Sequence, residues 1–374
     1  MHYTTIEIAQ MAVSFIALIL QLYIVYLILV ATPRNMYEYK FFIITFTTWD
    51  IIFSLVFGLC LSPIPAEPLM GIIVRGFSYY IGEFVSRCTA PAALYAGSMV
   101  MLSQVYCLVY RLTVRRILFR VINPNQTIHQ QLMSPLCKVL CFIFFQSISI
   151  AMATGFYYAL IPAEVNNFLY LKQMKDYVRS YGYKPEALAK TLEYAEEGES
   201  IVVMPVSNYT TWYCCVVLIS VFTVEIISAT LIFQTLRTLK ANSRVHSVIT
   251  QKLHLQFVRL LGAQVKTKLM VLPLVFFSIP TACCVILSAI YSISIDRHTI
   301  SYAYCLVSTY GVTNTLLSLF FISPYRRHCY ANVIRPLLWP FAFACNGFKR
   351  PNFSSADIVQ VEPTQTSQSH NTSL

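Results

Sequence analysis

The chain has 374 residues, of which 57% are hydrophobic and only 11% are charged, and its net charge is +11. About one quarter of the residues in a soluble domain are charged, so this composition indicates a membrane protein. The excess of Lys and Arg lies in loops beside apolar segments. It therefore favours contact with anionic lipid headgroups and a cytosolic partner, and no nucleic-acid partner is expected.

Seven long apolar segments follow one another along the chain. A helix needs about 20 apolar residues to cross a hydrocarbon layer about 30 Å thick, and each segment is long enough. We therefore predict an all-α membrane protein built as a bundle of seven transmembrane helices. The predicted spans are Ile8–Ala31, Phe41–Pro63, Cys88–Tyr110, Val139–Ile161, Trp212–Gln234, Leu269–Ile290 and Ile300–Ser323.

The loop charges predict the orientation of this bundle. If the N-terminus is outside, 19 of the 27 Lys and Arg residues fall on the inner side. Because cytoplasmic loops collect positive charge, we expect the N-terminus outside and the C-terminus inside. Residues 1–350 are predicted to form one receptor domain that includes a short interfacial helix after span seven. Residues 351–374 are polar and are predicted to be a disordered cytoplasmic tail.

Two connections are long enough to have structure of their own. The outer loop, Pro162–Thr211, has helical patterning and seven acidic residues, so it is either a solvated cap or a lid over a ligand entrance. The inner loop, Thr235–Lys268, has no acidic residue and repeats apolar residues at helical spacing. We predict that spans five and six continue below the membrane as helices. The basic residues either serve only to orient the chain in the membrane or also form a docking surface for a partner helix.

Two carboxylates lie inside predicted spans, Asp50 in the second and Glu225 in the fifth. A charge within hydrocarbon is costly, so both side chains should face the bundle interior. Asp50 is either a polar hub that rearranges on activation or a hydrogen-bonded packing residue. Glu225 is either a ligand contact or a packing residue, and the sequence leaves both alternatives open.

The chain has twelve Cys residues, scattered and without the spacing of a metal site. Cys88 opens the third span on the oxidising outer face, and a disulfide with Cys214 or Cys215 would pin the long outer loop over the bundle. Which of the two thiols pairs with Cys88 stays open. Asn208 begins a glycosylation sequon on the outer side, close to the membrane.

Motifs for enzymatic chemistry are not found in the sequence. It lacks a phosphate loop, GxSxG and HExxH, so we expect neither an enzyme nor a cofactor. The seventh predicted span has no Lys for a retinal Schiff base. The paired halves typical of a secondary transporter are not seen either.

Short motifs stand at the inner ends of two spans. Span three ends in Tyr110-Arg111, and span seven ends in Pro324-Tyr325-Arg326. Together with Asp50 and the Pro-rich outer turn Ser62–Gly71, these motifs resemble the nematode serpentine chemoreceptors of the Str superfamily, in particular the Srh and Sri classes. The resemblance covers about residues 8–330.

The resemblance implies a G-protein-coupled receptor for environmental chemicals such as odorants or pheromone-like molecules, acting in olfaction from the plasma membrane of a sensory cilium. Its partners would be a heterotrimeric G protein, a small-molecule ligand and the bilayer. Arg111 would correspond to the arginine that ends span three in rhodopsin-like receptors. Tyr110 replaces the acid expected before it, so carbonyl groups or lipid phosphate would hold Arg111 instead. Lys266 and Lys268 would line the cleft that receives the G protein.

Such a ligand would bind between spans three, five, six and seven. Position alone gives five pocket candidates, although ordinary bundle packing is the favoured role for any single one of them: Leu94, Met99, Phe222, Tyr302 and Tyr304. Two other classes of protein are alternatives. One is a ligand-gated cation channel of the insect odorant-receptor kind, whose inside N-terminus disagrees with the loop charges. The other is a small-solute transporter.

Overall fold

The computed structural model describes residues 5–32, 37–66, 71–121, 135–160, 193, 200–204, 208–241 and 297–336. The chain divides into two compact units, Met1–His328 and Cys329–Leu374. The first unit holds the helical bundle. Of the second unit, the structure describes the short π-helix η5 (Tyr330–Ile334) and the residues beside it.

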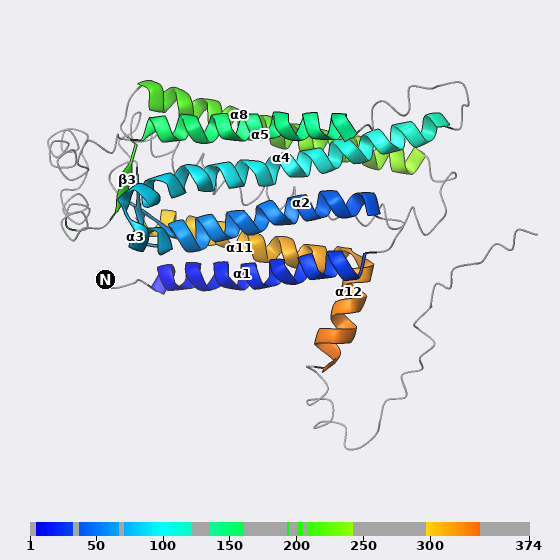
Figure 1. The fold of residues 1–374 in the computed structure, drawn as a ribbon, viewed down its shortest axis with the longest axis horizontal. Coiled ribbons are helices and arrows are strands. Elements are labelled where there is room, and N and C mark those ends of the chain that lie inside the picture. The colour runs from blue at the N-terminus through cyan, green and yellow to red at the C-terminus, as the bar shows by residue number, and fades with distance from the viewer. Residues whose placement is uncertain are drawn as a thin grey trace, which may run out of the picture. The chain divides into compact units, whose positions relative to one another are not determined.

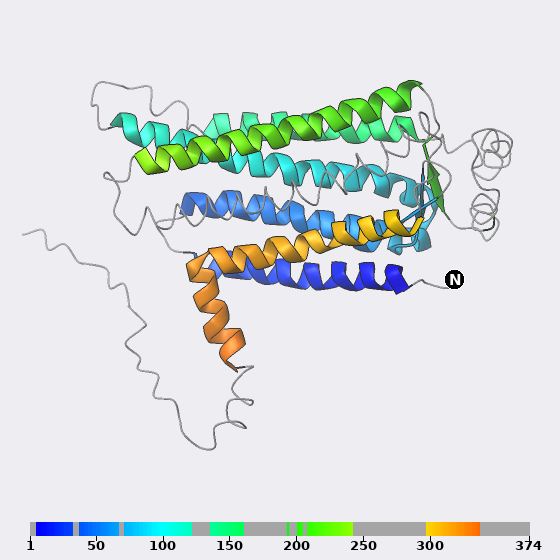
Figure 2. The same ribbon diagram turned by 180° about the vertical axis from the view of Figure 1, so that it is seen from behind.

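Long helices form the first unit and lie side by side along a common direction (Figures 1 and 2). In chain order the helices are α1 (Thr5–Val30), α2 (Tyr37–Phe53), the π-helix η2 (Ser54–Leu61), α3 (Phe77–Ile81), α4 (Glu83–Val121), α5 (Pro135–Ala159), α8 (Asn208–Ala241), α11 (Arg297–Phe321) and α12 (Ser323–Cys329). The α-helical membrane fold predicted from hydropathy is confirmed.

Five helices among the described residues are long and apolar enough to cross a membrane. They correspond to the predicted spans one to five, and α11 corresponds to span seven, with a sharp bend between Phe321 and Ser323. The predicted span six, Leu269–Ile290, lies outside the described residues. The short helix predicted after span seven is found as α12.

Two helices extend beyond the predicted membrane boundaries. Helix α4 continues to Val121, although hydropathy ended the third span at Tyr110. Helix α8 continues to Ala241, as expected from the apolar pattern that runs past span five. Within the bundle, 83% of the apolar segment of α4 is buried, against 6% of that of α5. Helix α4 is therefore the central helix, whereas α5 lies at the rim.

A small antiparallel sheet closes one end of the bundle, and hydropathy did not predict it. Its strands β1 (Pro63–Pro65), β2 (Gly71–Val74) and β3 (Ile201–Val203) are arranged in the order β1-β2-β3. Strand β1 pairs Ile64 with Ile73 of β2, and β2 pairs Ile72 with Val202 of β3. The sheet joins the turn after η2 to the end of the long loop before α8.

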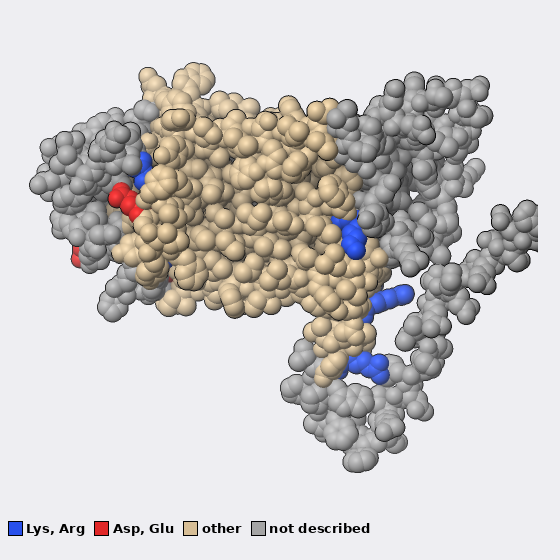
Figure 3. Space-filling model, viewed as in Figure 1, with Lys and Arg blue, Asp and Glu red and all other residues tan. Residues whose placement is uncertain are grey.

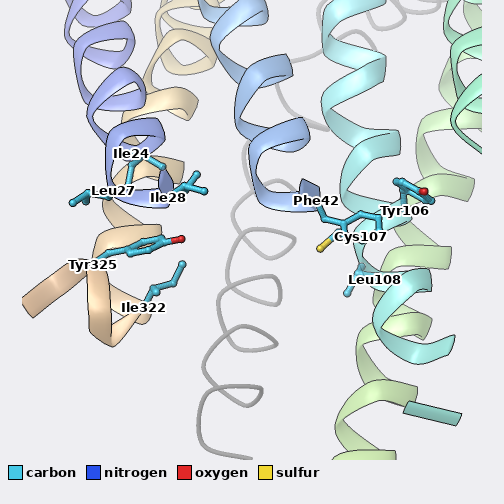
Figure 4. Close-up of a cluster of buried hydrophobic side chains, with 9 residues drawn as sticks. All are labelled: Ile24, Leu27, Ile28, Phe42, Tyr106, Cys107, Leu108, Ile322 and Tyr325. Carbon is cyan, nitrogen blue, oxygen red and sulfur yellow. The ribbon is translucent and has the colours of Figure 1, made fainter. Parts of the chain in front are cut away.

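Three apolar clusters fill the bundle from the sheet end to the opposite end. Leu61, Val74, Ala93 and Val202 belong to the first, which packs the sheet onto α4 and α5. The second joins α2, α4 and α11 in the middle of the bundle. The third lies where α12 begins (Figure 4), and it comprises Ile24, Leu27, Ile28, Phe42, Tyr106, Cys107, Leu108, Ile322 and Tyr325.

Candidate functional site

The centre of the bundle holds a buried group of polar side chains. Asp50 of α2 is 1% exposed and Asn314 of α11 is 5% exposed. The amide Nδ2 of Asn314 donates a hydrogen bond to Oδ2 of Asp50. These two residues are 264 positions apart in sequence, and their contact joins the second and the seventh predicted spans inside the membrane.

Helix α1 contributes Gln21 to the same group. The fully buried Gln21 donates from Nε2 to Ser54 Oγ at 2.9 Å and to the carbonyl oxygen of Asp50 at 3.4 Å. Helix α11 approaches these groups closely at Gly311, where a Cβ atom would lie 2.6 Å from Gln21 Nε2. A side chain at this position would have to displace Gln21 and Ser54 from their hydrogen bond.

Helix α8 reaches the polar group through a second carboxylate. Glu225 is 4% exposed, so this side chain faces the bundle interior, as the cost of charge in lipid requires. Tyr310 of α11 is 3% exposed and lies within electrostatic range of both Asp50 and Glu225. We call Gln21, Asp50, Ser54, Glu225, Tyr310 and Asn314 the polar core. It brings together α1, α2, η2, α8 and α11.

The polar face that α1 turns to its neighbours was not predicted from the sequence. Glu7, Gln10, Ser14 and Gln21 are all buried. They follow each other at helical spacing on the face that also carries Ala17 and Ile24. Alternating steps of three and four residues were the signal that could have revealed this face. They are typical of a helix seam rather than of a lipid-facing surface.

The motif that ends span seven has a structural role in this fold. Tyr325 is 1% exposed, and its hydroxyl shares a hydrogen bond of 3.0 Å with Thr32 Oγ1 at the end of α1. Arg326 is exposed, and its Nη1 donates to the carbonyl oxygen of Phe320 at 3.3 Å. Pro324 is half-buried. Tyr325 therefore fixes the start of α12 against α1.

The remaining residues predicted for G-protein coupling are placed only in part. Tyr110 and Arg111 lie within α4, well before the end of that helix at Val121. Lys266 and Lys268 lie outside the described residues. The roles predicted for all of them stay predictions.

The five pocket candidates differ in their exposure. Leu94 and Met99 are buried on α4, whereas Phe222 of α8 and Tyr302 of α11 are exposed by 47% and 60%. Tyr304 packs edge-to-face against Phe57 of η2, with 6.2 Å between the two ring centroids. Tyr304 therefore lies beside the π-helix η2, which supplies Ser54 to the polar core.

The outer cysteines and the sequon lie near the sheet. Cys88, Cys214 and Cys215 are free thiols in the structure, and the disulfide stays a prediction. The sheet itself already links the long loop to the turn after η2. Asn208 is exposed at the start of α8, and its glycosylation also stays a prediction.

Charged side chains lie on the surface at the two ends of the bundle and not at its middle (Figure 3). On the face shown, basic side chains lie at the end that carries α12, acidic side chains lie at the sheet end together with basic ones, and the surface between the two ends is uncharged. Among the described residues, no group of three or more His, Cys, Asp or Glu side chains is arranged to hold a metal ion.

Comparisons with known proteins agree with this architecture. The sequence profile of the family "serpentine type 7TM GPCR chemoreceptor Str" matches residues 6–330. The chain belongs to this family. The squid rhodopsin crystal structure has a similar fold, with a TM-score of 0.55 and 12% sequence identity. That match covers 92% of this chain and 87% of the rhodopsin chain. No curated protein matches the chain in sequence.

Membership of the Str family makes the chain a multi-pass membrane protein of the receptor type. The likeness to squid rhodopsin extends over nearly the whole bundle, but at this identity it concerns the fold alone. The narrower placement in the Srh or Sri class stays a prediction.

Proposed function

We propose that the chain is a chemosensory receptor of the plasma membrane, with the N-terminus outside, that binds a small molecule and activates a heterotrimeric G protein. The observation that carries this proposal is the Str family match over residues 6–330. The basic side chains at the α12 end support the orientation, since positive charge collects on the cytoplasmic side. The sheet end would then face outward, toward the ligand.

The polar core is the best candidate for the element that changes between resting and active states. A ligand shifts the equilibrium only by binding one arrangement better than the other. Displacing α8 or α11 would change the surroundings of Tyr310 and the hydrogen bond between Asn314 and Asp50. The contacts of one buried group would thus couple ligand binding to the positions of several helices.

The first experiment tests the receptor against its two alternatives. Cells that express the full chain with an epitope tag before Met1 are exposed to a panel of volatile and water-soluble compounds. The proposal expects surface labelling without permeabilisation and a ligand-dependent second-messenger signal. A ligand-dependent current without a G protein would indicate the channel, and uptake of the compound would indicate the transporter.

The second experiment tests coupling at the end of span three. Arg111→Lys keeps the charge but loses the planar fork of donors, so we expect normal surface delivery and a reduced G-protein response. Arg115→Lys, on the same helix, is the matched control and should leave the response unchanged. Equal dose–response curves for the two variants would contradict a special role for Arg111.

A further inference from the structure

Helix α3 presents a large apolar face to the surroundings of the bundle. Phe77, Tyr80 and Ile81 are exposed by 63%, 66% and 70%, and Phe84 at the start of α4 is exposed by 68%. Isolated exposed apolar residues are common, but a contiguous group of large ones marks a surface that binds something apolar. We call Phe77, Tyr80, Ile81 and Phe84 the α3 patch.

The opposite side of α3 is fixed to the bundle. Ser78, which is 1% exposed, donates from Oγ to the carbonyl oxygen of Cys60 at 2.6 Å. The backbone N–H of Gly76 donates to the carbonyl oxygen of Leu61 at 3.2 Å. A Cβ atom at Gly76 would collide with the backbone of Cys60. The orientation of the α3 patch is thus set by backbone contacts with η2.

Exposed aromatic residues mark the level of the membrane surface at this end. Tyr158 ends α5, Tyr209 and Trp212 begin α8, and Tyr302 begins α11, and all four are exposed. Tyr and Trp side chains concentrate where hydrocarbon meets water, because their rings are apolar and their polar atoms bind water. These residues form an aromatic belt at the sheet end of the bundle, where α3 also lies (Figure 1).

We propose that α3 is an interfacial anchor whose partner is the phospholipid surface of the leaflet at the sheet end. The α3 patch continues the aromatic belt, and its mixture of Phe, Ile and Tyr suits the boundary between acyl chains and headgroups. Strand β2 leads into α3 through Arg75 and Gly76. The anchor therefore holds the sheet against the membrane as well as against the bundle.

This inference does not depend on the ligand, on the G protein or on which end is outside. Continuity with the aromatic belt favours lipid over a second copy of the chain as the occupant. A second copy would have to displace lipid from the same level of the membrane, so it is kept as an outcome of the test.

Tryptophan fluorescence in lipid nanodiscs tests the anchor in the full-length chain. The background carries Trp49→Phe, Trp212→Phe and Trp339→Phe, which removes all three native Trp residues. Phe77→Trp and Phe84→Trp are each added alone. The probe is phosphatidylcholine with bromine on the upper carbons of the acyl chains, in discs that hold one receptor. Retained Trp212 is the positive control, and Glu193→Trp, exposed in the long loop, is the negative control.

The anchor predicts that brominated lipid quenches Phe77→Trp and Phe84→Trp to the same extent as Trp212, whereas Glu193→Trp keeps its emission. Phe→Trp at an exposed site keeps the apolar character, and Tyr80→Trp supplies a third reading if one variant folds poorly. The proposal would be overturned if brominated lipid quenched these Trp residues as little as it quenches Glu193→Trp. Emission that changes only in discs holding two receptors would also overturn it, because a second copy would then cover the patch.

Discussion

Different kinds of interaction stabilise the sheet end and the α12 end of the bundle. At the sheet end, backbone groups bind each other: Val74 N–H donates to the Ser200 carbonyl at 2.9 Å, and Ala66 N–H donates to the Gly71 carbonyl at 3.0 Å. At the α12 end, side chains supply the contacts, and the buried Tyr325 lies beside Ile24, Leu27 and Ile28 of α1 (Figure 4).

This difference indicates which end is able to move. A ladder of backbone hydrogen bonds fits one register, so changing it breaks several bonds together. Packed side chains, by contrast, can exchange between a few discrete arrangements when helices shift. The sheet end is therefore suited to hold a fixed geometry, and the α12 end is suited to open. The predictions that follow test this contrast.

The largest effect is expected from Gly76→Val at the sheet end. The new Cβ would collide with the backbone of Cys60 and Leu59, which no side-chain rotation relieves. We expect destabilisation of about 3 kcal/mol or more, and most of the protein should fail to reach the cell surface. Flow cytometry of an N-terminally tagged receptor measures the surface fraction.

Ala229→Val is the matched control for this substitution. Ala229 is exposed on α8 and already carries a Cβ atom, so this control measures the effect of a β-branched side chain where no backbone stands in the way. Its surface fraction should equal that of the unaltered chain. Normal delivery of Gly76→Val would show that the contact between η2 and α3 is looser than the structure indicates.

The helices of the bundle could be read from sequence because lipid imposes a simple rule. Backbone polar groups in hydrocarbon must bind within their own segment, so a long apolar run has to be helical. The predicted segment Ile8–Ala31 is α1 within a few residues, and Val139–Ile161 is α5. Asp50 and Glu225 were placed inward by the cost of charge in lipid, and both are buried.

The sheet and the π-helix follow no such rule. Strands β1 and β3 have three residues each, and two of the three in β1 are proline, which cannot donate to a ladder. Strand β3 pairs with β2, which lies more than 120 residues before it in sequence, and no local pattern encodes this pairing. Nor does hydropathy distinguish η2 from a regular helix. The partner of Asp50, Asn314, was missed because a single amide in an apolar span has many possible neighbours.

The second-largest effect is expected in the polar core, at the centre of the bundle between the two ends. Asn314→Leu removes the amide that donates a hydrogen bond to Asp50. The buried oxygen Oδ2 of Asp50 then lacks this donor. A loss of about 2–3 kcal/mol in stability and a weaker ligand response are expected. Thermal unfolding of the purified receptor measures the first, and a second-messenger assay measures the second.

An exchange of the two side chains separates pairing from simple packing. Asp50→Asn combined with Asn314→Asp restores one carboxylate and one amide within reach of each other. We expect the double variant to recover more stability than Asn314→Asp alone, which would place two carboxylates together. Strictly additive effects of the two substitutions would rule out direct coupling between these positions.

The smallest effect is expected at the α12 end, from Tyr325→Phe. The ring remains in its apolar cluster, and only the hydrogen bond to Thr32 Oγ1 is lost. The cost should be about 1 kcal/mol, seen as a small decrease in the unfolding temperature. Thr32→Val should cost about as much.

A double-mutant cycle decides whether that hydrogen bond holds α12 to α1. Tyr325→Phe with Thr32→Val should be about as stable as either single variant, because both remove the same bond. Tyr330→Phe, at an exposed position, controls for loss of a hydroxyl and should change nothing. Side-chain packing still closes this end in the double variant, so the receptor should reach the surface and respond to ligand. If the double variant lost surface delivery as completely as Gly76→Val, the α12 end would be as rigid as the sheet end.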